Sequence, residues 1–141
     1  MGDIVIDASL ILKLAVVRQD EDYIPEALNI LERFIKGEFE IAVPSIWKYE
    51  VGNRLLQSHP EVANVVMKEL LNHKYQEKEL GDEYCLRIFE FAKGIPGVTY
   101  YDAAYHVLAF EMNRTLVTAD EKYFKKISRK GHILFIGDWE I

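Results

Sequence analysis

The stretch Ile4-Val5-Ile6-Asp7-Ala8-Ser9 decides how the chain folds. Its first three residues are apolar and β-branched, which is typical of a short strand buried on both faces of a parallel sheet. Asp7 ends this run, and apolar residues then follow at helical spacing. These residues are Leu10, Ile11, Leu14 and Val17. The stretch therefore predicts a buried strand that leads directly into a helix, with a carboxylate where the two elements meet.

Three further apolar runs predict strands, at residues 39–43, 115–117 and 133–136, and residues 95–99 predict a turn with a short extended piece. Helical patterns separate them. The predicted helices cover residues 23–36, a segment around Glu50, residues 61–75, residues 82–93, a segment from Asp102 to about 113, and a basic segment from about 121. Because short strands alternate with helices and parallel crossovers are right-handed, we expect a three-layer α/β/α fold with a central parallel sheet.

Composition limits the classes of protein that remain. The chain has 141 residues, half of them hydrophobic, which suits one domain spanning residues 1–141 with a real core. No apolar run approaches the roughly 20 residues of a membrane span, and no secretory leader is evident. Cys85 is the single cysteine, which excludes an internal disulfide and favours a reducing cytoplasm.

The charge pattern bears on nucleic-acid binding. The formal net charge of -6 argues against a passive nucleic-acid binder, although it does not exclude a nuclease whose acids are neutralised by metal. One segment is basic throughout. Its cations are Lys122, Lys125, Lys126, Arg129 and Lys130. Two interpretations of this segment stay open: a solvated helix face, or a patch that contacts phosphates.

Four acids are candidates for a functional site. Asp7 ends the first predicted strand, and Asp120 follows the strand at 115–117 within a few residues. Sites in open parallel sheets form at the carboxyl ends of the strands. Glu50 and Asp102 stand on helices that begin at the same edge. We therefore predict that the four carboxylates converge there.

Each acid also has a simpler structural explanation. Asp is a common helix N-cap, and Asp7, Asp102 and Asp120 each stand near a predicted helix start. Thr99-x-x-Asp102 fits a capping box. Glu50 lies beyond the first turn of its helix, beside buried positions, where an unpaired carboxylate is costly. Its alternative role is an ion pair with Lys48 or Arg54.

The chemistry of converging carboxylates favours a hard cation. They would raise one another's pKa unless a cation lay among them. Oxygen ligands without Cys or His suit Mg²⁺ or Mn²⁺, in one or two ions. Such a site can activate water and stabilise charge on a phosphodiester. The sequence lacks a phosphate-binding loop, a zinc-protease motif and a nucleophile elbow. For His106, local hydrogen bonding or packing is the favoured role.

The sequence resembles the PIN domain and, within it, the VapC-type toxins of toxin–antitoxin pairs. The residues that carry the resemblance are Ile4-Val5-Ile6-Asp7-Ala8-Ser9, Val43-Pro44-Ser45 with Glu50-Val51-Gly52-Asn53-Arg54-Leu55, Tyr101-Asp102-Ala103-Ala104-Tyr105 and Leu116-Val117-Thr118-Ala119-Asp120. The resemblance implies a PIN-like fold with a sheet of about five parallel strands. It also implies a Mg²⁺- or Mn²⁺-dependent endoribonuclease that cleaves RNA with metal-activated water. The implied catalytic and metal-binding residues are Asp7, Glu50, Asp102 and Asp120.

The resemblance implies further roles and partners. Ser9 and Thr118 match hydroxyl positions that orient the acids, with helix capping as their alternative. Lys122, Lys125, Lys126 and Arg129 are the candidate RNA contacts. The family implies a homodimer and an antitoxin partner, for which the apolar stripes at residues 23–36 and 61–75 are candidate surfaces.

Other functions stay open or are disfavoured. A housekeeping PIN nuclease in RNA processing and a catalytically silent PIN binding module remain alternatives. A phosphoacceptor receiver is disfavoured because Asp7 has no acidic neighbour and the strand at 39–43 ends in Pro44. An aspartyl phosphatase is disfavoured because Asp7-Ala8-Ser9 lacks a second Asp.

Overall fold

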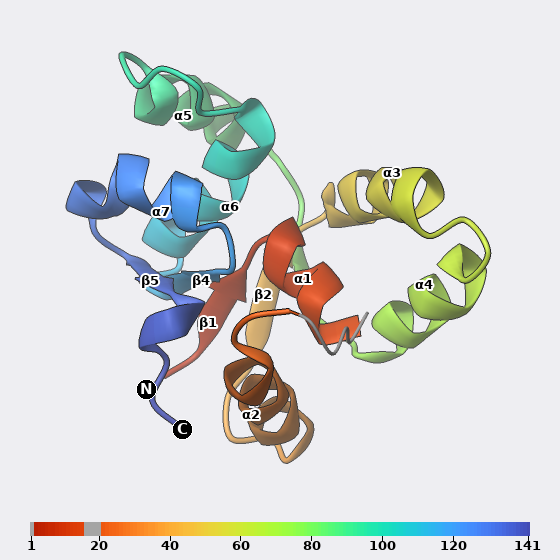
Figure 1. Ribbon diagram of the computed structural model, residues 1–141. Helices are drawn as coiled ribbons and strands as arrows, with labels where there is room; N and C mark the ends of the chain where they lie inside the picture. Colours follow the sequence, from red (N-terminus) through yellow and green to blue (C-terminus); the bar gives the residue numbers. More distant parts are fainter. Residues whose placement is uncertain (1, 16–20) are drawn as a thin grey trace.

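The computed structural model describes residues 2–15 and 21–141 (Figure 1). The strands are β1 (Ile4–Ile6), β2 (Ile41–Pro44), β3 (Gln76–Lys78), β4 (Thr115–Thr118) and β5 (Ile133–Phe135). The helices are α1 (Ala8–Ala15), α2 (Ile24–Ile35), α3 (Trp47–Ser58), α4 (Ala63–Asn72), α5 (Asp82–Ala92), α6 (Tyr100–Glu111) and α7 (Glu121–Ile127). Two 3-10 turns, η1 (Ser128–Lys130) and η2 (Ile136–Asp138), flank β5. Val17, assigned above to the first helix, lies outside the described residues.

The five strands form one sheet in the order β3-β2-β1-β4-β5, and every neighbouring pair is parallel. β1 lies at the centre, and all three of its residues are fully buried. Its apolar run therefore forms the buried strand that the sequence predicted. Ile6 pairs with Val117 of β4, so the residues that follow these strands leave the sheet side by side.

The strands predicted from apolar runs are confirmed as β1, β2, β4 and β5, with boundaries shifted by one or two residues. The extended piece predicted at 95–99 is not a strand. The fifth strand is β3, Gln76–Lys78, at the edge of the sheet beside β2. Its side chains are largely exposed, because an edge strand is held by backbone pairing and needs no apolar face.

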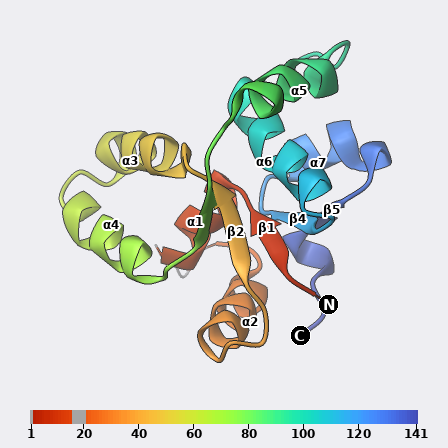
Figure 2. The same ribbon diagram turned by 180° about the vertical axis from the view of Figure 1, so that it is seen from behind.

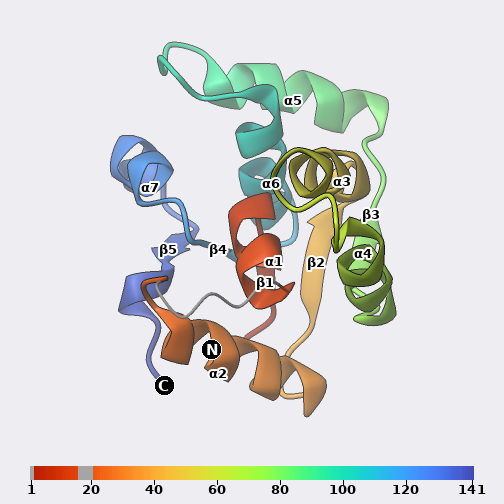
Figure 3. The same cartoon turned by 45° about the vertical axis from the view of Figure 1, so that its right-hand side comes forward.

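Helices cover both faces of the sheet, as Figures 1 and 2 show from opposite sides. On one face α6 packs against β1, β2 and β4, and α5 covers α6. On the other face α1 packs against β4 and contacts α2, α3 and α4 (Figure 3). This confirms the predicted three-layer α/β/α architecture. Within the described residues, none of the helices has the length and apolar character needed to cross a bilayer.

The helix boundaries follow local chemistry. Glycines just past the ends of α2 and α5, Gly37 and Gly94, each have φ of +77°, a left-handed conformation that favours glycine at a helix end. Thr99 caps α6 with a complete capping box, in which Asp102 is the third helical residue. Helix α6 buries every residue from Ala103 to Ala109, so the start of this helix is held rigidly against the sheet.

Candidate active site

Asp7 lies immediately after β1, at the carboxyl edge of the sheet, and is 8% exposed. Its Oδ1 accepts hydrogen bonds from the Ser9 hydroxyl (2.5 Å) and from the backbone N–H of Leu10 (3.1 Å). Its Oδ2 accepts a hydrogen bond from the Thr118 hydroxyl. Burial raises the pKa of Asp7, and the nearby Asp102 carboxylate raises it further, whereas these three hydrogen bonds lower it.

The Ser9 and Thr118 hydroxyls link the ends of β1 and β4. Thr118 is fully buried and accepts a hydrogen bond from the backbone N–H of Asp120 (3.0 Å) while its hydroxyl donates to Asp7. Ser9 donates to Asp7 and accepts from the backbone N–H of Ala119 (3.1 Å). Both side chains therefore contact Asp7 and the segment that carries Asp120. Their contacts agree with the orienting role that the sequence suggested, which remains a prediction.

Asp102 and Asp120 each combine a capping contact with a position at this edge. Asp102 receives the backbone N–H of Thr99 (3.4 Å) and donates its own N–H to the Thr99 hydroxyl (3.0 Å). Asp120 is the N-cap of α7 and accepts from the backbone N–H of Tyr123 (2.9 Å). The capping alternative is thus correct for both residues. It does not compete with a metal-binding role, because each carboxylate has a second oxygen.

Glu50 lies in the first turn of α3, not beyond it as the sequence suggested, and its side chain is 12% exposed. Its Oε2 lies 3.4 Å from a guanidinium nitrogen of Arg54, which confirms the ion pair considered above. Its Oε1 is buried without a hydrogen-bond partner among the described residues, and so is the hydroxyl oxygen of Tyr105. Burial raises the pKa of Glu50, and the adjacent Tyr105 hydroxyl opposes that rise. The two groups therefore lie close together without an ideal hydrogen-bond geometry.

The charges of the four carboxylates act on one another in pairs. Burial is the largest cause of the raised pKa of Glu50, and the charges of Asp102 and Asp7 add to it. Burial likewise raises the pKa of Asp102, and the charge of Asp120 adds to that rise. Arg54 offsets part of the rise for both Glu50 and Asp102. These effects place Glu50 near Asp7 and Asp102, and Asp102 near Asp120, whereas the convergence of all four side chains on one site and their catalytic role remain predictions.

The donor set suits a hard divalent cation. All the candidate ligands are carboxylate oxygens, and Oε1 of Glu50 is a buried acceptor without a well-aligned hydrogen bond among the described residues. Within the described residues, no three carboxylate, imidazole or thiol groups are close enough to form a ready-made metal-binding cluster. Three of the carboxylates, those of Asp7, Asp102 and Asp120, accept hydrogen bonds from backbone N–H groups at the starts of their helices. Mg²⁺ keeps several waters and needs only one or two carboxylates, so the arrangement fits it.

The basic segment runs along α7 and η1, away from Asp120. Lys125 lies 3.9 Å from Glu121 on the same helix, and both side chains are more than half exposed. Lys130 lies over the ring of Phe91, 5.3 Å from its centroid. Lys122, Lys126 and Arg129 are exposed. These positions agree with a solvated helix face and equally with a phosphate-contacting patch.

Sequence reasoning missed the side chain of Tyr105 and one further interaction of Arg54. Tyr105 lies one turn after Asp102 on α6, is 1% exposed and points its hydroxyl toward Glu50. Arg54 acts on Asp102 as well as on Glu50. The spacing of Asp102 and Tyr105, three residues apart on one helix, was the available signal for Tyr105. His106 is fully buried and hydrogen-bonded, as the favoured local role predicted.

Comparisons with known proteins give the fold. The sequence matches no protein-family model, and no curated protein is significantly similar to it. Among solved structures, PAE2754 from Pyrobaculum aerophilum is 22% identical, with a TM-score of 0.63, over 97% of this chain and 93% of that chain. VapBC2 from Rickettsia felis, solved bound to a DNA fragment from their promoter, is 16% identical, with a TM-score of 0.67, over 96% and 97% of the two chains. At these identities the similarity is one of fold, and it shows that the chain has the PIN-like α/β/α fold that its motifs predicted.

Proposed function

We propose that this chain, as one domain spanning residues 1–141, is a Mg²⁺- or Mn²⁺-dependent endoribonuclease. The observation that carries the proposal is the network of mutual charge effects that links Asp7, Glu50, Asp102 and Asp120 across four separate segments, with raised pKa values for the first three. A protein that leaves acidic groups so close to one another gains most from a bound cation. The likeness in fold to VapBC2 supports the same assignment.

The four acids would hold one or two ions through their carboxylate oxygens. When bound, the cation would activate water and offset the charge that develops on a phosphodiester. The rest of the site positions the acids. Ser9 and Thr118 hold the carboxylate of Asp7 in one orientation and favour its ionised form. Asp120 caps α7, so the positive end of that short helix also favours a negative charge at this point.

Arg54 has two roles available in this proposal. Its guanidinium interacts with Glu50 and lowers the pKa of both Glu50 and Asp102. Because its side chain is 45% exposed, it is also accessible to a phosphate of the substrate. The cations Lys122, Lys125, Lys126 and Arg129 on α7 and η1 would supply further phosphate contacts along the strand.

We also propose a protein partner of the antitoxin kind. The fold likeness to VapBC2, solved with DNA from their promoter, supports it. The two helices considered above as candidate surfaces each carry exposed apolar side chains beside their buried stripe. These are Leu28 and Ile35 on α2 and Val65 and Leu71 on α4. A homodimer is supported by exposed Leu86 and Phe89 on α5, and the free thiol of Cys85 suits the cytoplasm.

Two alternatives keep the same fold. A housekeeping nuclease would use the same acids and differ only in its partner. A silent binding module is favoured by one observation, that among the described residues no three potential ligands form a ready-made metal cluster. Calorimetric titration with Mg²⁺ and Mn²⁺ separates this module from an enzyme, since the module would show no specific binding that Asp102→Asn removes.

The decisive experiment is a cleavage assay on single-stranded RNA with the purified full chain. We expect cleavage that requires Mg²⁺ or Mn²⁺, stops in EDTA, and is lost in Asp7→Asn and Asp102→Asn with the circular dichroism spectrum unchanged. Asp82→Asn on the exposed start of α5 is the matched control and should cleave like the wild type. Cleavage that persists in EDTA, or survives both site variants, would reject the proposal.

A further inference from the structure

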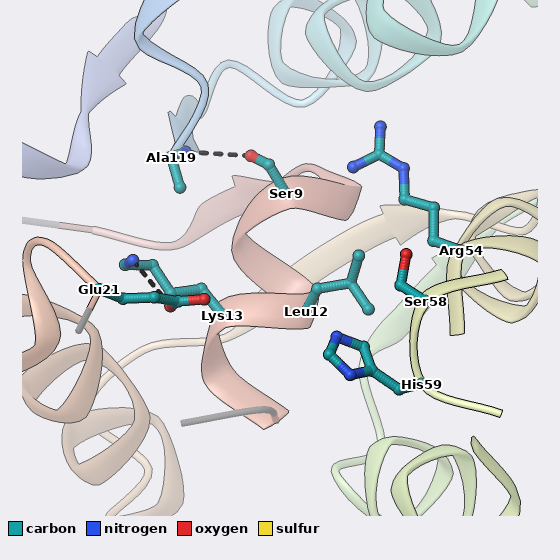
Figure 4. Close-up of a pocket in the computed structure, with 8 residues that line it drawn as sticks. All are labelled: Ser9, Leu12, Lys13, Glu21, Arg54, Ser58, His59 and Ala119. Carbon is teal, nitrogen blue, oxygen red and sulfur yellow. Dashed lines mark hydrogen bonds and ion pairs between the residues drawn. The ribbon is translucent and has the colours of Figure 1, made fainter. Parts of the chain in front are cut away.

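A pocket of about 400 Å³ opens beside the acid centre, between α1 and α3 (Figure 4). It shares one wall with the centre, because Ser9 and Ala119 line it and Ser9 hydrogen-bonds to Asp7. Ligand pockets in proteins span roughly 300–1,000 Å³, so this one is large enough for a group of nucleotide size. A molecule in the pocket would therefore lie next to whatever reacts at the acids.

Two cationic side chains and an apolar one are among the residues that line this pocket. Figure 4 shows Leu12 projecting from α1 toward Arg54, and Lys13 projecting from the other side of α1 toward Glu21. Within the part of the chain that the structure describes, Arg54 has one carboxylate contact, at 3.4 Å to Glu50, and so has further guanidinium donors to offer. A nucleotide in a strand offers groups that match these side chains, namely two phosphates and a sugar with its base.

Lys13 is held in an ion pair that a phosphate could replace. Its ammonium lies 3.1 Å from Oε2 of Glu21, and the two side chains are 11% and 30% exposed. Glu21 is thus an anion of the protein itself that is paired with Lys13, one of the two cations of the pocket. An ammonium has three donors, so Lys13 can also contact a phosphate while it remains near Glu21.

We propose that this pocket binds one nucleotide of a single-stranded nucleic acid, with Arg54 and Lys13 on its two phosphates and Leu12 against its sugar or base. The proposal rests on the proposed nuclease function, because it places the neighbouring phosphodiester at the acid centre. A single strand is required because a base can reach Leu12 only when it is out of the stack. Glu21 competes with the phosphate for Lys13 and lowers the affinity of the pocket.

Substitutions at the two residues of this ion pair test the proposal, because they should change RNA affinity in opposite directions. Lys13→Gln and Glu21→Gln break the same salt bridge, so a purely structural pair would change binding in the same direction for both. The proposal instead predicts that Lys13→Gln weakens binding about tenfold, the size of a lost charge-assisted contact, and that Glu21→Gln strengthens it. The probe is a fluorescent single-stranded oligoribonucleotide, bound to the full chain carrying Asp102→Asn so that the probe stays intact.

Salt dependence adds a second readout. Removing one phosphate contact from a single-strand complex lowers the slope of log affinity against log salt by about 0.7, which we expect for Lys13→Gln. The matched controls are Lys36→Gln and Glu32→Gln, which break an exposed ion pair (2.8 Å) on α2 with the same changes in net charge. These controls should shift affinity by far less than the pocket variants.

The outcomes separate this proposal from the nuclease assignment. If the wild type cleaves RNA but Lys13→Gln and Glu21→Gln change affinity in the same direction, or no more than the controls, the nucleotide pocket is wrong and the nuclease stands. If the pocket variants behave as predicted while the wild type cleaves nothing, the pocket stands without the catalysis. Polyglutamate that competes with the oligoribonucleotide for the Asp102→Asn protein and not for the same protein carrying Lys13→Gln, with no opposite shifts for RNA, would assign the pocket to an acidic protein segment instead.

Discussion

Nδ1 of His106 lies 2.8 Å from the hydroxyl of Tyr123, deep between α6 and α7. Nε2 of the same ring lies 2.8 Å from the carbonyl oxygen of Gly131. Because a carbonyl only accepts, Nε2 must carry the proton, and the Tyr123 hydroxyl must donate to Nδ1. Tyr123 also donates its backbone N–H to Asp120. The hydrogen bond between His106 and Tyr123 therefore joins α6, which carries Asp102, to α7, which Asp120 caps.

We predict that His106→Phe destabilises the protein by about 3 kcal/mol, because it leaves the Tyr123 hydroxyl and the Gly131 carbonyl buried without partners. Tyr123→Phe removes one bond of the same chain and should cost less. Urea unfolding of both variants measures the difference. If α6 and α7 are positioned by this bond, both variants should also lose affinity for Mn²⁺, whereas a merely structural pair would leave the affinity of the folded protein unchanged.

Glu50→Gln should raise the free energy of unfolding of the metal-free protein at neutral pH, by an amount on the order of 1 kcal/mol, because it removes a buried charge beside other carboxylates. The pKa of Glu50 is raised from 4.5, so the folded state binds its proton at higher pH than the unfolded state does. The penalty is therefore complete above the folded pKa and vanishes as the pH falls below 4.5. Urea unfolding from neutral to acidic pH should show the two stabilities converging.

The titration of His106 changes the free energy of unfolding with pH in the opposite direction. The comparison between the wild type and Glu50→Gln must remove this contribution. Burial lowers the pKa of His106 to about 4, so the unfolded state takes up a proton first and stability falls as the pH drops from 6.5 toward 4. Both proteins carry His106, so the difference between them isolates Glu50. A stability gap that stays constant with pH would contradict the assignment of a raised pKa to Glu50.

Divalent cations should stabilise the folded chain through the four acids. At 100 times the dissociation constant, a ligand specific for the folded state adds about 2.7 kcal/mol. Differential scanning fluorimetry should therefore show a rise in melting temperature with Mn²⁺ that is larger at about pH 8 than at about pH 5, where protons compete for the carboxylates. Asp7→Asn and Asp102→Asn should abolish the rise. An equal rise in both variants would point to another binding site.

Thr118→Val keeps the shape of a fully buried side chain and removes its hydroxyl. We expect a loss of about 1–3 kcal/mol, because Asp7 loses a donor and the backbone N–H of Asp120 loses its acceptor. The pKa of Asp7 should rise further, since the Thr118 hydroxyl lowers it. Cleavage by the variant should therefore decline at a higher pH than in the wild type as the solution is made more acidic. Thr115→Val, at the start of the same strand, is the control and should leave the pH profile unchanged.

Much of this fold is predictable because its core elements carry strong patterns. The β-branched run of β1, the stripes of the long helices and the capping box at Thr99 each specify local structure, and the structure has them all. The strand β3 was missed because Gln76–Lys78 is polar. It forms through backbone pairing with β2. This pairing depends on the position of the end of α4, because β3 follows that helix in the chain.

The acids of the site were predictable for a different reason. Asp7 and Asp120 follow neighbouring parallel strands, and the topology alone brings such residues together. The orphaned hydroxyl of Tyr105 and the pocket beside Leu12 were not predictable, because both depend on how side chains from α1, α3 and α6 meet. The spacing of residues within one helix does not indicate which side chains of other helices they contact.

The central place of β1 has a consequence for biosynthesis. Its partner on one side, β4, begins more than a hundred residues later, at Thr115. A nascent chain on the ribosome thus exposes Asp7 and Glu50 long before Asp102 and Asp120 have been translated. Truncated translation products that stop before β4 would lack Asp120 and the pairing of β1 with β4, so premature termination yields a fragment without the complete candidate site.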